Sequence, residues 1–525
     1  MQSNAITLVW FKRDLRLHDH APLAAAAARG AVLPVFVVEP DILRAADADA
    51  MHYRFVCECV VELRAQLAAL GQPLIVRTGD AVEVFEALRQ QVAFDAVYAH
   101  QETGNALTYA RDRQALAWAQ QAGVAWHEWP QHGVVRVLKS RNGWARTWRA
   151  RMQAPQVQPP ARLTALPALS AGALPSAEAL GLTDLHPAVG QRSGVQQGGE
   201  TRGLATLHSF LTERGGDYQR KISAPATAAV AGSRISAYLA WGALSLRRAV
   251  QEAENSALPS RAKRAFLSRL HWHCHFMQKL ESEPEIETRC FNPCYEQMRA
   301  PHDNTQRYLA AWCEGRTGYP FVDACMRSLQ ATGWLNFRMR AMLVSFAAYN
   351  LWLDWRLFRD FLARQFLDYE PGIHMSQLQM QSGVTGINTP RIYNPVKQGL
   401  EHDPDGHFVR RWVPELADVP TLFIHQPWKL SAMERLACNL KEADYPAPIV
   451  EHLAAIRAAR EHIAAIRNSA RHREVAGEVF DRHGSRRKAR DRATDASYRK
   501  RRAKGRDGRR FDQPGVHEKQ LSLFE

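Results

Sequence analysis

The first 135 residues alternate between short apolar runs and longer segments with helical spacing, and this alternation constrains the fold more than any other feature. The apolar runs are rich in β-branched and aromatic residues, which is typical of strands. They cover residues 6–11, 32–38, 73–76 and 94–99, and the helical stretches include 21–29, 56–70 and 106–122. Strands that alternate with helices predict a Rossmann-like α/β domain with a mainly parallel sheet covered on both faces. No G-x-G-x-x-G follows the first run, so the usual dinucleotide-binding turn is not predicted.

The pattern changes beyond this domain, which we assign to residues 1–135. Residues 153–200 place prolines among Ala, Gly, Ser and Gln, so we predict an interdomain linker over 136–204 with short helical pieces. Residues 205–465 show helical spacing and dense tryptophan, which predicts a larger all-α domain. Residues 466–525 are basic and poor in apolar side chains, a composition typical of a disordered tail with at most a nascent helix.

The positive charge is concentrated in that tail. The chain carries 68 Lys and Arg against 53 Asp and Glu, a net charge of +15. Residues 471–510 alone hold 16 Lys and Arg against 6 Asp and Glu, so the rest of the chain is nearly balanced. The charge indicates a polyanionic partner such as nucleic acid, reached mainly through the tail.

Several classes of protein are excluded. The longest apolar stretch, 341–355, is shorter than the ~20 residues needed to span a bilayer. Lys12 and Arg13 fall where a signal peptide would be apolar, and eight cysteines do not make a disulfide scaffold in a chain of 525 residues. We therefore expect a cytoplasmic, monomeric protein with no membrane contact.

Two segments of the helical domain indicate a polar or anionic ligand. Residues 232–239 (GSRISAYL) place hydroxyl residues before a helix, which suits a phosphate, although a serine N-cap is a common alternative. Residues 376–383 (SQLQMQSG) are unusually polar, and fit either a ligand-binding wall or a solvated loop. Arg338 and Arg340 can bind phosphate or carboxylate groups.

Several motifs together resemble the DNA photolyase/cryptochrome family, in its order and spacing. They are residues 9–17 (VWFKRDLRL), 232–239, 317–340, 354–356 (DWR), 391–395 (RIYNP) and 411–416 (RWVPEL). The resemblance implies an α/β antenna domain, an all-helical FAD-binding domain and blue or near-UV photochemistry. The family's repair members split pyrimidine photoproducts by electron transfer from photoexcited reduced flavin.

The resemblance also implies which residues contact the cofactor. The positions that match are Tyr218, Gly232, Ser233, Ile235, Ser236, Asn336, Arg338, Asp368, Glu370 and His374. Gly232 stands where many members have Thr, so one hydroxyl contact is lost. We match Arg338 and Asp368 to the family's Arg–Asp pair beside the isoalloxazine, which would stabilise an anionic reduced flavin.

The lesion pocket departs from the family's standard pattern. Trp272 matches the aromatic residue that stacks on the flipped lesion, and flipping a damaged base costs the least energy. However, Arg269 replaces a glutamate and Met380 replaces the second stacking tryptophan of enzymes that repair cyclobutane dimers. Phe337 and Ala341 replace the histidine pair of (6-4) photolyases. The predicted DNA-binding residues are Arg269, Trp272, Arg338, Arg340 and Met380.

The redox environment of the flavin is also unusual. His374 stands where photolyases place an asparagine opposite the flavin ring, and a histidine there is expected to alter which redox state persists. Leu378 replaces the flavin-proximal tryptophan of the photoreduction chain, Trp355 matches its middle member, and His302 falls near its outer member. Photoreduction must then use another route, for which Trp334, Trp352 and Tyr393 are candidates. The predicted catalytic residues are Trp272, Trp355 and His374.

Other cofactors are less supported. The segment from His271 to His275 (HWHCH) resembles a metal cluster but lacks an acidic partner at a known spacing, so no metal is predicted. Cys290, Cys294, Cys313 and Cys325 resemble the cysteine set of the family's iron–sulfur branch, but Cys325 lies inside a helix motif where that branch does not place its ligands, so no cluster is predicted. The residues that grip a folate antenna have no clear match, so a second chromophore is expected only as an unidentified one.

The chain ends in a peptide that resembles the motif by which bacterial repair proteins dock onto the DNA sliding clamp. It comprises Gln520, Leu521, Ser522, Leu523 and Phe524. In a flexible tail, such a peptide can present apolar side chains to a partner's pocket.

Together these features predict an FAD-dependent, light-driven photolyase, a carbon–carbon lyase that acts on UV-damaged DNA. The alternatives are a cryptochrome-like photoreceptor without repair activity and light-independent DNA binding by the tail alone.

Overall fold

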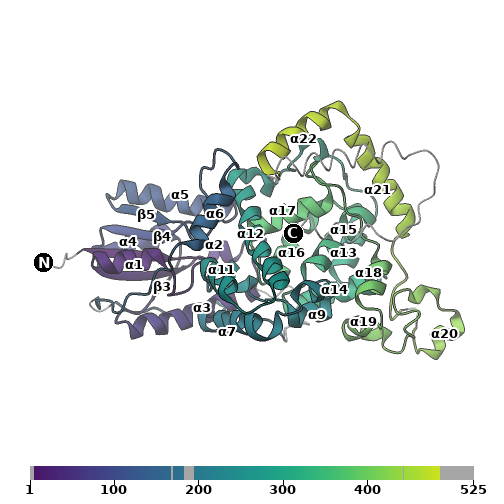
Figure 1. Ribbon diagram of the computed structural model, residues 1–525, viewed down its shortest axis with the longest axis horizontal. Helices are drawn as coiled ribbons and strands as arrows, with labels where there is room; N and C mark the ends of the chain where they lie inside the picture. The colour runs from purple at the N-terminus through teal and green to yellow at the C-terminus, as the bar shows by residue number, and fades with distance from the viewer. Residues whose placement is uncertain (1–4, 167–168, 183–193, 442, 485–525) are drawn as a thin grey trace.

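The computed structural model describes residues 5–166, 169–182, 194–441 and 443–484. An α/β domain lies at one end of the molecule and a larger helical domain forms the rest (Figure 1). The parallel strands are β1 (Ile6–Phe11), β2 (Ala31–Val38), β3 (Ile75–Thr78), β4 (Ala96–His100) and β5 (Ala125–Trp129), in the order β3-β2-β1-β4-β5. The predicted parallel α/β domain is therefore confirmed. The edge strand β5 was not predicted, because its polar residues His127 and Glu128 hide its alternation.

The strands bury both faces, as a doubly covered sheet requires. Val9 and Phe11 of β1 belong to a core shared with α1 and α3. Leu8 and Trp10, which point to the opposite face, belong to a core shared with α4 and α5. The helices that accompany the sheet are α1 (Ala21–Arg29), α2 (Pro40–Leu43), α3 (Ala50–Ala69), α4 (Ala81–Gln91), α5 (Ala106–Gln121) and α6 (Trp144–Gln153).

All regular elements in the described part of the second domain are helices, as predicted. Its first half comprises α7 (Glu200–Ser209), the π-helix η2 (Phe210–Arg214), α8 (Tyr218–Lys221), α9 (Pro225–Ala231), α10 (Ser236–Ala240), α11 (Leu246–Asn255), α12 (Ser260–Ser282), η3 (Pro284–Glu287), η4 (Pro293–Tyr295) and α13 (Thr305–Cys313). Its second half comprises α14 (Pro320–Thr332), α15 (Phe337–Ser345), the π-helix η5 (Phe346–Asn350), α16 (Trp355–Gln365), α17 (Pro371–Ser382), α18 (Pro395–His402), α19 (His407–Trp412), η6 (Pro414–Leu416), η7 (Pro427–Lys429), α20 (Ala432–Ala437), α21 (His452–Arg467) and α22 (Ala470–His483).

The folded body extends further toward the C-terminus than the composition predicts. Residues 470–483, assigned to a disordered tail, form α22, which lies along the upper edge of the helical domain (Figure 1). Val479 packs in a small core with Leu280. His472 Nε2 and the Tyr295 hydroxyl are joined by a hydrogen bond of 2.9 Å. The assignment of 466–525 to a tail was thus wrong for residues up to His483, because a few apolar contacts suffice to dock a polar helix.

The loop that follows β1 joins the two domains. Arg13 donates from Nε to the Ala240 carbonyl at 2.8 Å and from Nη2 to the Tyr369 carbonyl at 2.6 Å. Arg16, buried to 1% exposure, donates to the Gly242 carbonyl at 2.8 Å. These bonds satisfy carbonyl groups of the helical domain with side chains from the α/β domain, so this loop sets how the domains meet.

One glycine makes this approach possible. Gly242 has a φ of 65°, and a Cβ built there would lie 2.5 Å from Asp14 Cα. Gly123 has a similar φ of 68° but nothing within 4 Å of its Cβ position. The two glycines therefore share the left-handed conformation and differ in the contact.

No helix among the residues that the structure describes is long and apolar enough to cross a bilayer.

We predict that Gly242→Ala destabilises the protein much more than Gly123→Ala. Both changes carry the left-handed penalty of about 1 kcal/mol. Only the first also forces backbone apart at the domain interface, where overpacking adds about 1–3 kcal/mol. Thermal unfolding of both variants measures the difference, and equal melting temperatures would contradict this account of the interface.

Candidate functional site

Asp368 is the point at which the predicted cofactor segments meet. It lies just before α17 and is paired with Arg340 of α15 through two hydrogen bonds, Nη1–Oδ1 at 3.0 Å and Nη2–Oδ2 at 2.9 Å. Ser236, at the start of α10, also hydrogen-bonds this carboxylate. Burial would raise the pKa of Asp368, but the Arg340 charge and these hydrogen bonds lower it, so the group is an anion. Three segments far apart in sequence are thereby held together.

The predicted pairing of Asp368 with Arg338 was wrong, because Arg340 is its partner. Residues two apart on α15 point to nearly opposite sides of the helix, so only one of the two arginines can face Asp368. Arg340 also donates from Nε to the Leu335 carbonyl at 2.6 Å, which fixes its orientation. Arg338 is half-buried and makes no hydrogen bond or ion pair with the residues described.

Two buried acceptor groups, the Asn336 side-chain oxygen and the Glu370 carboxyl, receive no hydrogen bond from the residues described. Asn336 donates from Nδ2 to the carbonyls of Ile222 and Ser223, both at 2.9 Å, while its Oδ1 is buried without a partner. Glu370 is 6% exposed, and no hydrogen bond or ion pair is found for it in the described part of the chain. Burial raises the pKa of Glu370 to about 7, against the Arg13 charge, which lowers it. Unpaired buried polar groups cost about 1–3 kcal/mol each, so they fit a polar ligand such as FAD.

Tyr218 begins α8 and is buried. Burial raises the pKa of its hydroxyl, while the charge of Arg269 and a hydrogen bond with it act in the opposite direction. Arg269, predicted to lie in the lesion pocket, is thus engaged with a predicted cofactor residue. Gly232, Ser233 and Ile235 lie in the segment between α9 and α10, adjacent in sequence to Ser236.

A second glycine brings the helix of Trp272 against the helix of His374. A Cβ on Gly372 of α17 would lie 2.6 Å from Met277 Cα of α12. Only a glycine allows the two helices to approach this closely. Trp272 is half-buried and contacts the rings of His275 and Phe276 on the same helix, at centroid distances of 4.7 and 5.5 Å. Met380, at the other end of α17, is also half-buried.

The hydrogen bonding of His374 identifies its tautomer. Its Nε2 lies 2.9 Å from the Arg359 carbonyl, which can only accept a hydrogen bond. Burial lowers the pKa of His374 to about 4, so the ring is neutral at pH 7. A neutral ring that carries its proton on Nε2 leaves Nδ1 as a hydrogen-bond acceptor. The N–H of His374 is therefore directed at the protein backbone.

The aromatic residues considered for photoreduction lie in contrasting surroundings. Trp355 is fully buried in the core around α16, and Leu378 is 2% exposed. Arg234 stacks 4.0 Å over the Trp334 ring, and Arg299 lies 4.8 Å over the Trp352 ring. A cation against the ring opposes the positive charge of an oxidised tryptophan. The cations therefore disfavour oxidation of Trp334 and Trp352, and a photoreduction route through these residues or Tyr393 stays a prediction.

The histidine-rich segment of α12 serves structural contacts in the described structure. His275 Nδ1 accepts a hydrogen bond from Arg141 at 2.5 Å. His271 packs against the rings of Trp144 and Trp148 at 5.1 and 4.9 Å. His271 and His275 therefore both contact side chains of the segment that carries Arg141, Trp144 and Trp148.

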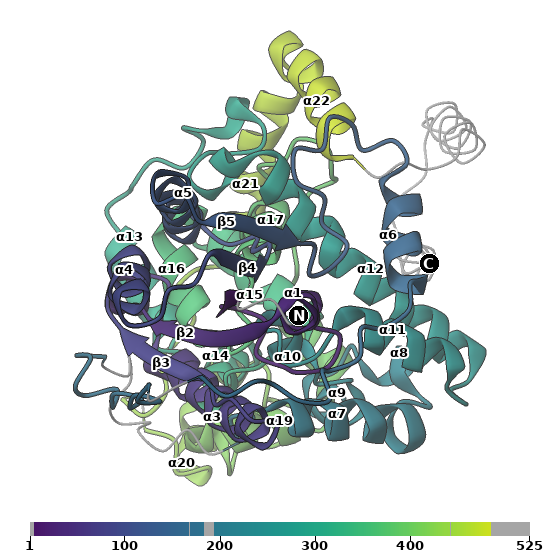
Figure 2. The same cartoon turned by 90° about the vertical axis from the view of Figure 1, so that its left-hand side faces the viewer.

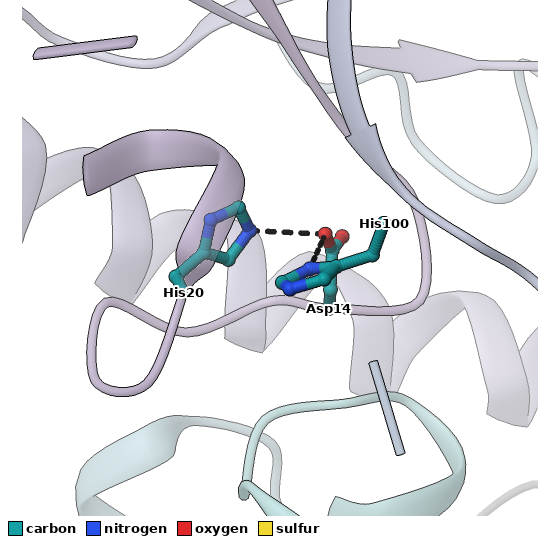
Figure 3. A group of neighbouring side chains, drawn as sticks. All are labelled: Asp14, His20 and His100. Carbon is teal, nitrogen blue, oxygen red and sulfur yellow. Dashed lines mark hydrogen bonds and ion pairs between the residues drawn. The ribbon is translucent and has the colours of Figure 1, made fainter. Parts of the chain in front are cut away.

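A different cluster, which the sequence did not reveal, brings three ionisable residues together at the carboxyl end of the sheet. Asp14 follows β1, His20 precedes α1 and His100 ends β4, and both imidazoles bond the same carboxylate oxygen (Figure 3). The distances from Asp14 Oδ2 are 2.9 Å to His20 Nε2 and 2.8 Å to His100 Nδ1. Burial would raise the pKa of Asp14, yet these histidines hold it well below its usual range.

The three side chains are close enough to share a metal ion. Their hydrogen bonds instead place protons on the nitrogens that face Asp14. His20 Nδ1 accepts the Leu23 backbone N–H at 3.1 Å, so its proton resides on Nε2. A metal on Nε2 would require the ring to lose that proton and become an anion, or to give up the helix cap. The geometry therefore describes two neutral donors around one carboxylate.

The C-terminal peptide, with Gln520, Leu521, Leu523 and Phe524, lies outside the described residues. So do residues 485–510, which carry most of the chain's net positive charge.

Comparison with known proteins matches both domains. Residues 7–154 match the family model of DNA photolyase, and residues 266–465 match the FAD binding domain of DNA photolyase. A cryptochrome DASH from Gloeobacter violaceus is 30% identical over 473 residues, covering 86% of this chain and 94% of the relative. A deoxyribodipyrimidine photo-lyase from Alkalihalophilus pseudofirmus is 30% identical over 474 residues, covering 86% of this chain and 96% of the relative.

The solved structures lead to the same family. The crystal structure of a bacterial class III photolyase from Agrobacterium tumefaciens superimposes with a TM-score of 0.79 at 26% identity, covering 89% of this chain and 99% of that one. The segments that meet at Asp368 lie in the helical domain that these comparisons match, and the site's unpaired polar groups fit its cofactor. The chain therefore belongs to the DNA photolyase/cryptochrome family, with an FAD-binding helical domain.

Proposed function

We propose that the protein is a light-driven DNA photolyase, a carbon–carbon lyase that repairs UV-induced pyrimidine photoproducts with electrons from reduced FAD. The observation that carries this proposal is the position of Trp272. It is a half-buried aromatic residue on α12, and the close contact of Gly372 with Met277 holds this helix against the segment that bears Asp368, Glu370 and His374. An aromatic platform beside a flavin segment suits a flipped base.

In this proposal, five residues of the helical domain form the cofactor site. Arg340, Asp368 and Ser236 form the rigid frame of the cofactor site, and Asn336 and Glu370 offer it unpaired polar atoms. The bound flavin supplies the electron under blue light. The Arg340 charge offsets Asp368 in this buried setting, where an unpaired carboxylate would be costly.

Arg338 is the arginine that we assign to DNA. It lies on α15, two residues before Arg340, and is paired neither with Asp368 nor with another described carboxylate. A guanidinium without a protein acceptor can bind a backbone phosphate. This division assigns cofactor support to Arg340 and phosphate contact to Arg338, while Met380 remains a candidate for the pocket wall.

A cryptochrome-like photoreceptor without repair activity is the second candidate. The observation that favours it is the engagement of Arg269 with Tyr218, which turns a lesion-pocket position toward the cofactor site. A second, antenna chromophore stays a prediction under either function.

The direct test is to reduce the flavin, illuminate the protein with blue light and assay separately for loss of cyclobutane dimers and of (6-4) photoproducts. The photolyase proposal expects loss of one of them in the light and of neither in the dark. Retention of both lesions by protein with reduced flavin would favour the photoreceptor, whatever the affinity for DNA.

Arg340→Gln should abolish stable flavin binding, whereas Arg338→Gln should retain it. The first change leaves Asp368 as an unpaired buried charge, which costs about 3–5 kcal/mol. The second removes the same charge from the same helix and should weaken DNA binding alone. Flavin absorbance per protein and fluorescence anisotropy with duplex DNA measure both effects. Loss of flavin from both variants, or from Arg338→Gln alone, would refute the pairing of Arg340 with the cofactor site.

His374→Asn should shift the resting redox state of the flavin. Asparagine replaces a neutral acceptor, Nδ1, with an amide that can also donate. The absorption spectrum of the purified protein and its rate of photoreduction report the change. An unchanged spectrum and an unchanged rate would count against a redox role for His374.

The clamp-docking peptide is a further proposal, supported by its sequence. A pull-down with the bacterial sliding clamp should succeed with the full chain and fail after the double change Leu523→Ala and Phe524→Ala. Ser522→Ala serves as the control, because its side chain is not part of the apolar anchor. Equal retention of the clamp by the double variant would rule the docking out.

A further inference from the structure

A surface groove of about 450 Å³ lies between α4 and α5 of the α/β domain. These two helices lie side by side on one face of the sheet (Figure 2). The groove is lined by Val82, Glu83, Glu86, Ala87, Gln90 and Trp118. It contains no lysine or arginine, and neither the cofactor site nor the proposed function uses it.

Trp118 forms a fixed aromatic floor in this groove. Its ring is half-buried and packs against the rings of Phe85 and Phe94, at centroid distances of 5.6 and 6.3 Å. Its indole N–H donates a hydrogen bond to Glu86 Oε2 at 3.0 Å. The ring and one carboxylate are therefore held next to each other.

The ring of Trp118 lacks a cation, in contrast to other tryptophans of the chain. Arg141 lies 4.5 Å over the Trp144 ring, and Arg13 lies 4.4 Å over the Trp241 ring. No arginine or lysine among the described residues lies over Trp118 in this way. Since an indole face attracts cations, and arginine stacks on it well, this face is available to a cation from outside the described residues.

The carboxylates beside the ring favour the same kind of ligand. Glu83 and Glu86 are exposed and lie three residues apart on α4, so they share one side of the helix. Neither forms an ion pair with a residue that the structure describes. An aromatic face with two unpaired carboxylates suits a segment rich in arginine and lysine.

The chain itself contains such a segment. Residues 499–506 (RKRRAKGR) hold six Lys and Arg and no acidic residue, and they lie outside the described residues. The described chain ends at Gly484, directly after α22. The end of α22 is attached to the end of α12, because His483 Nε2 bonds Glu283 Oε2 at 2.5 Å.

The point at which the described chain ends lies within reach of the groove. Glu287, in the short helix η3 that follows α12, accepts the backbone N–H of Ala106 at 2.8 Å, and Ala106 is the first residue of α5. Trp118 lies about 18 Å further along this helix. The chain from Gly484 to Arg499 spans about 50 Å when extended, which is long enough to reach it.

We propose that the groove between α4 and α5 binds residues 499–506 of the same chain, with an arginine stacked on Trp118 and paired with Glu83 and Glu86. A guanidinium that is paired with a carboxylate does not at the same time neutralise a phosphate. DNA therefore competes with the groove for the same positive charges. The groove holds the basic segment when no DNA is bound, and it weakens the binding of DNA by that segment.

Carbodiimide crosslinking of the full chain loaded with flavin tests the contact directly, because the reagent joins a lysine amine to a carboxylate that touches it. Mass spectrometry of the digested monomer should find Lys500 or Lys504 joined to Glu83 or Glu86. An excess of duplex DNA should abolish these links. The absence of such links, or their presence only in crosslinked dimers, would overturn the proposal.

Trp118→Leu should lower the yield of these links at least threefold, although both carboxylates remain in place. Tyr109→Leu is the matched control, because Tyr109 is an aromatic residue on the same helix, 40% exposed and outside the groove. The control should crosslink as the wild-type protein does. Equal yields from the two variants would overturn the stacking on Trp118 and with it the proposal.

A surface variant that leaves the packing of Trp118 intact gives an independent measurement. Glu83→Gln combined with Glu86→Gln should bind undamaged duplex DNA at least threefold more tightly than the wild-type protein, because the basic segment is released. Glu254→Gln combined with Glu461→Gln removes the same charge from two exposed positions on α11 and α21 and is the control. Equal DNA affinity of the two double variants would overturn the proposal.

A change in the basic segment completes the test. When Arg499, Lys500, Arg501 and Arg502 are all replaced by glutamine, the groove has lost its ligand. The double change at Glu83 and Glu86 should then alter DNA affinity no more than the control pair does, because the two sets of residues act through one interaction. A threefold advantage that persists in this background would refute the competition between groove and DNA.

Discussion

The docking of the loop after β1 into the helical domain is the interaction on which the candidate site depends. Arg13 holds the carbonyls of Ala240 and Tyr369, and Tyr369 lies directly between Asp368 and Glu370. The Tyr369 hydroxyl donates to Asp47 of the α/β domain at 2.7 Å, so this residue is held at both ends. The α/β domain therefore helps to position residues 368–370, which are predicted to contact the flavin.

Burial determines the charge state of the interior around this frame. The pKa of His273 falls to about 4 and that of His100 to about 3, mainly because burial disfavours the charged ring. These imidazoles are neutral at pH 7, whereas Asp368 keeps its charge because Arg340 pairs with it.

The sequence predicted the large features well, since they depend on local patterns. Strand and helix alternation follows from the burial of both sheet faces, and the motif order identified the family before any contact was known. The prediction was wrong where two residues of the same type lie close together in the sequence and only one of them pairs with Asp368. Arg338 and Arg340 are equally suitable by chemistry, and only the direction in which α15 meets Asp368 selects Arg340. It also missed the cluster of Asp14, His20 and His100, whose members lie far apart along the chain.

The sequence alone determined the fold class, the flavin-domain motifs and the residue types available to the site, because periodicity and motif spacing are properties of the chain itself. The tertiary structure decided which of those residues meet, which ring nitrogen of His374 carries the proton, and which arginine is left without a partner. These properties depend on the direction in which each side chain points and on how deeply it is buried. They depend on how distant segments pack together, and a linear order of residues does not specify that packing.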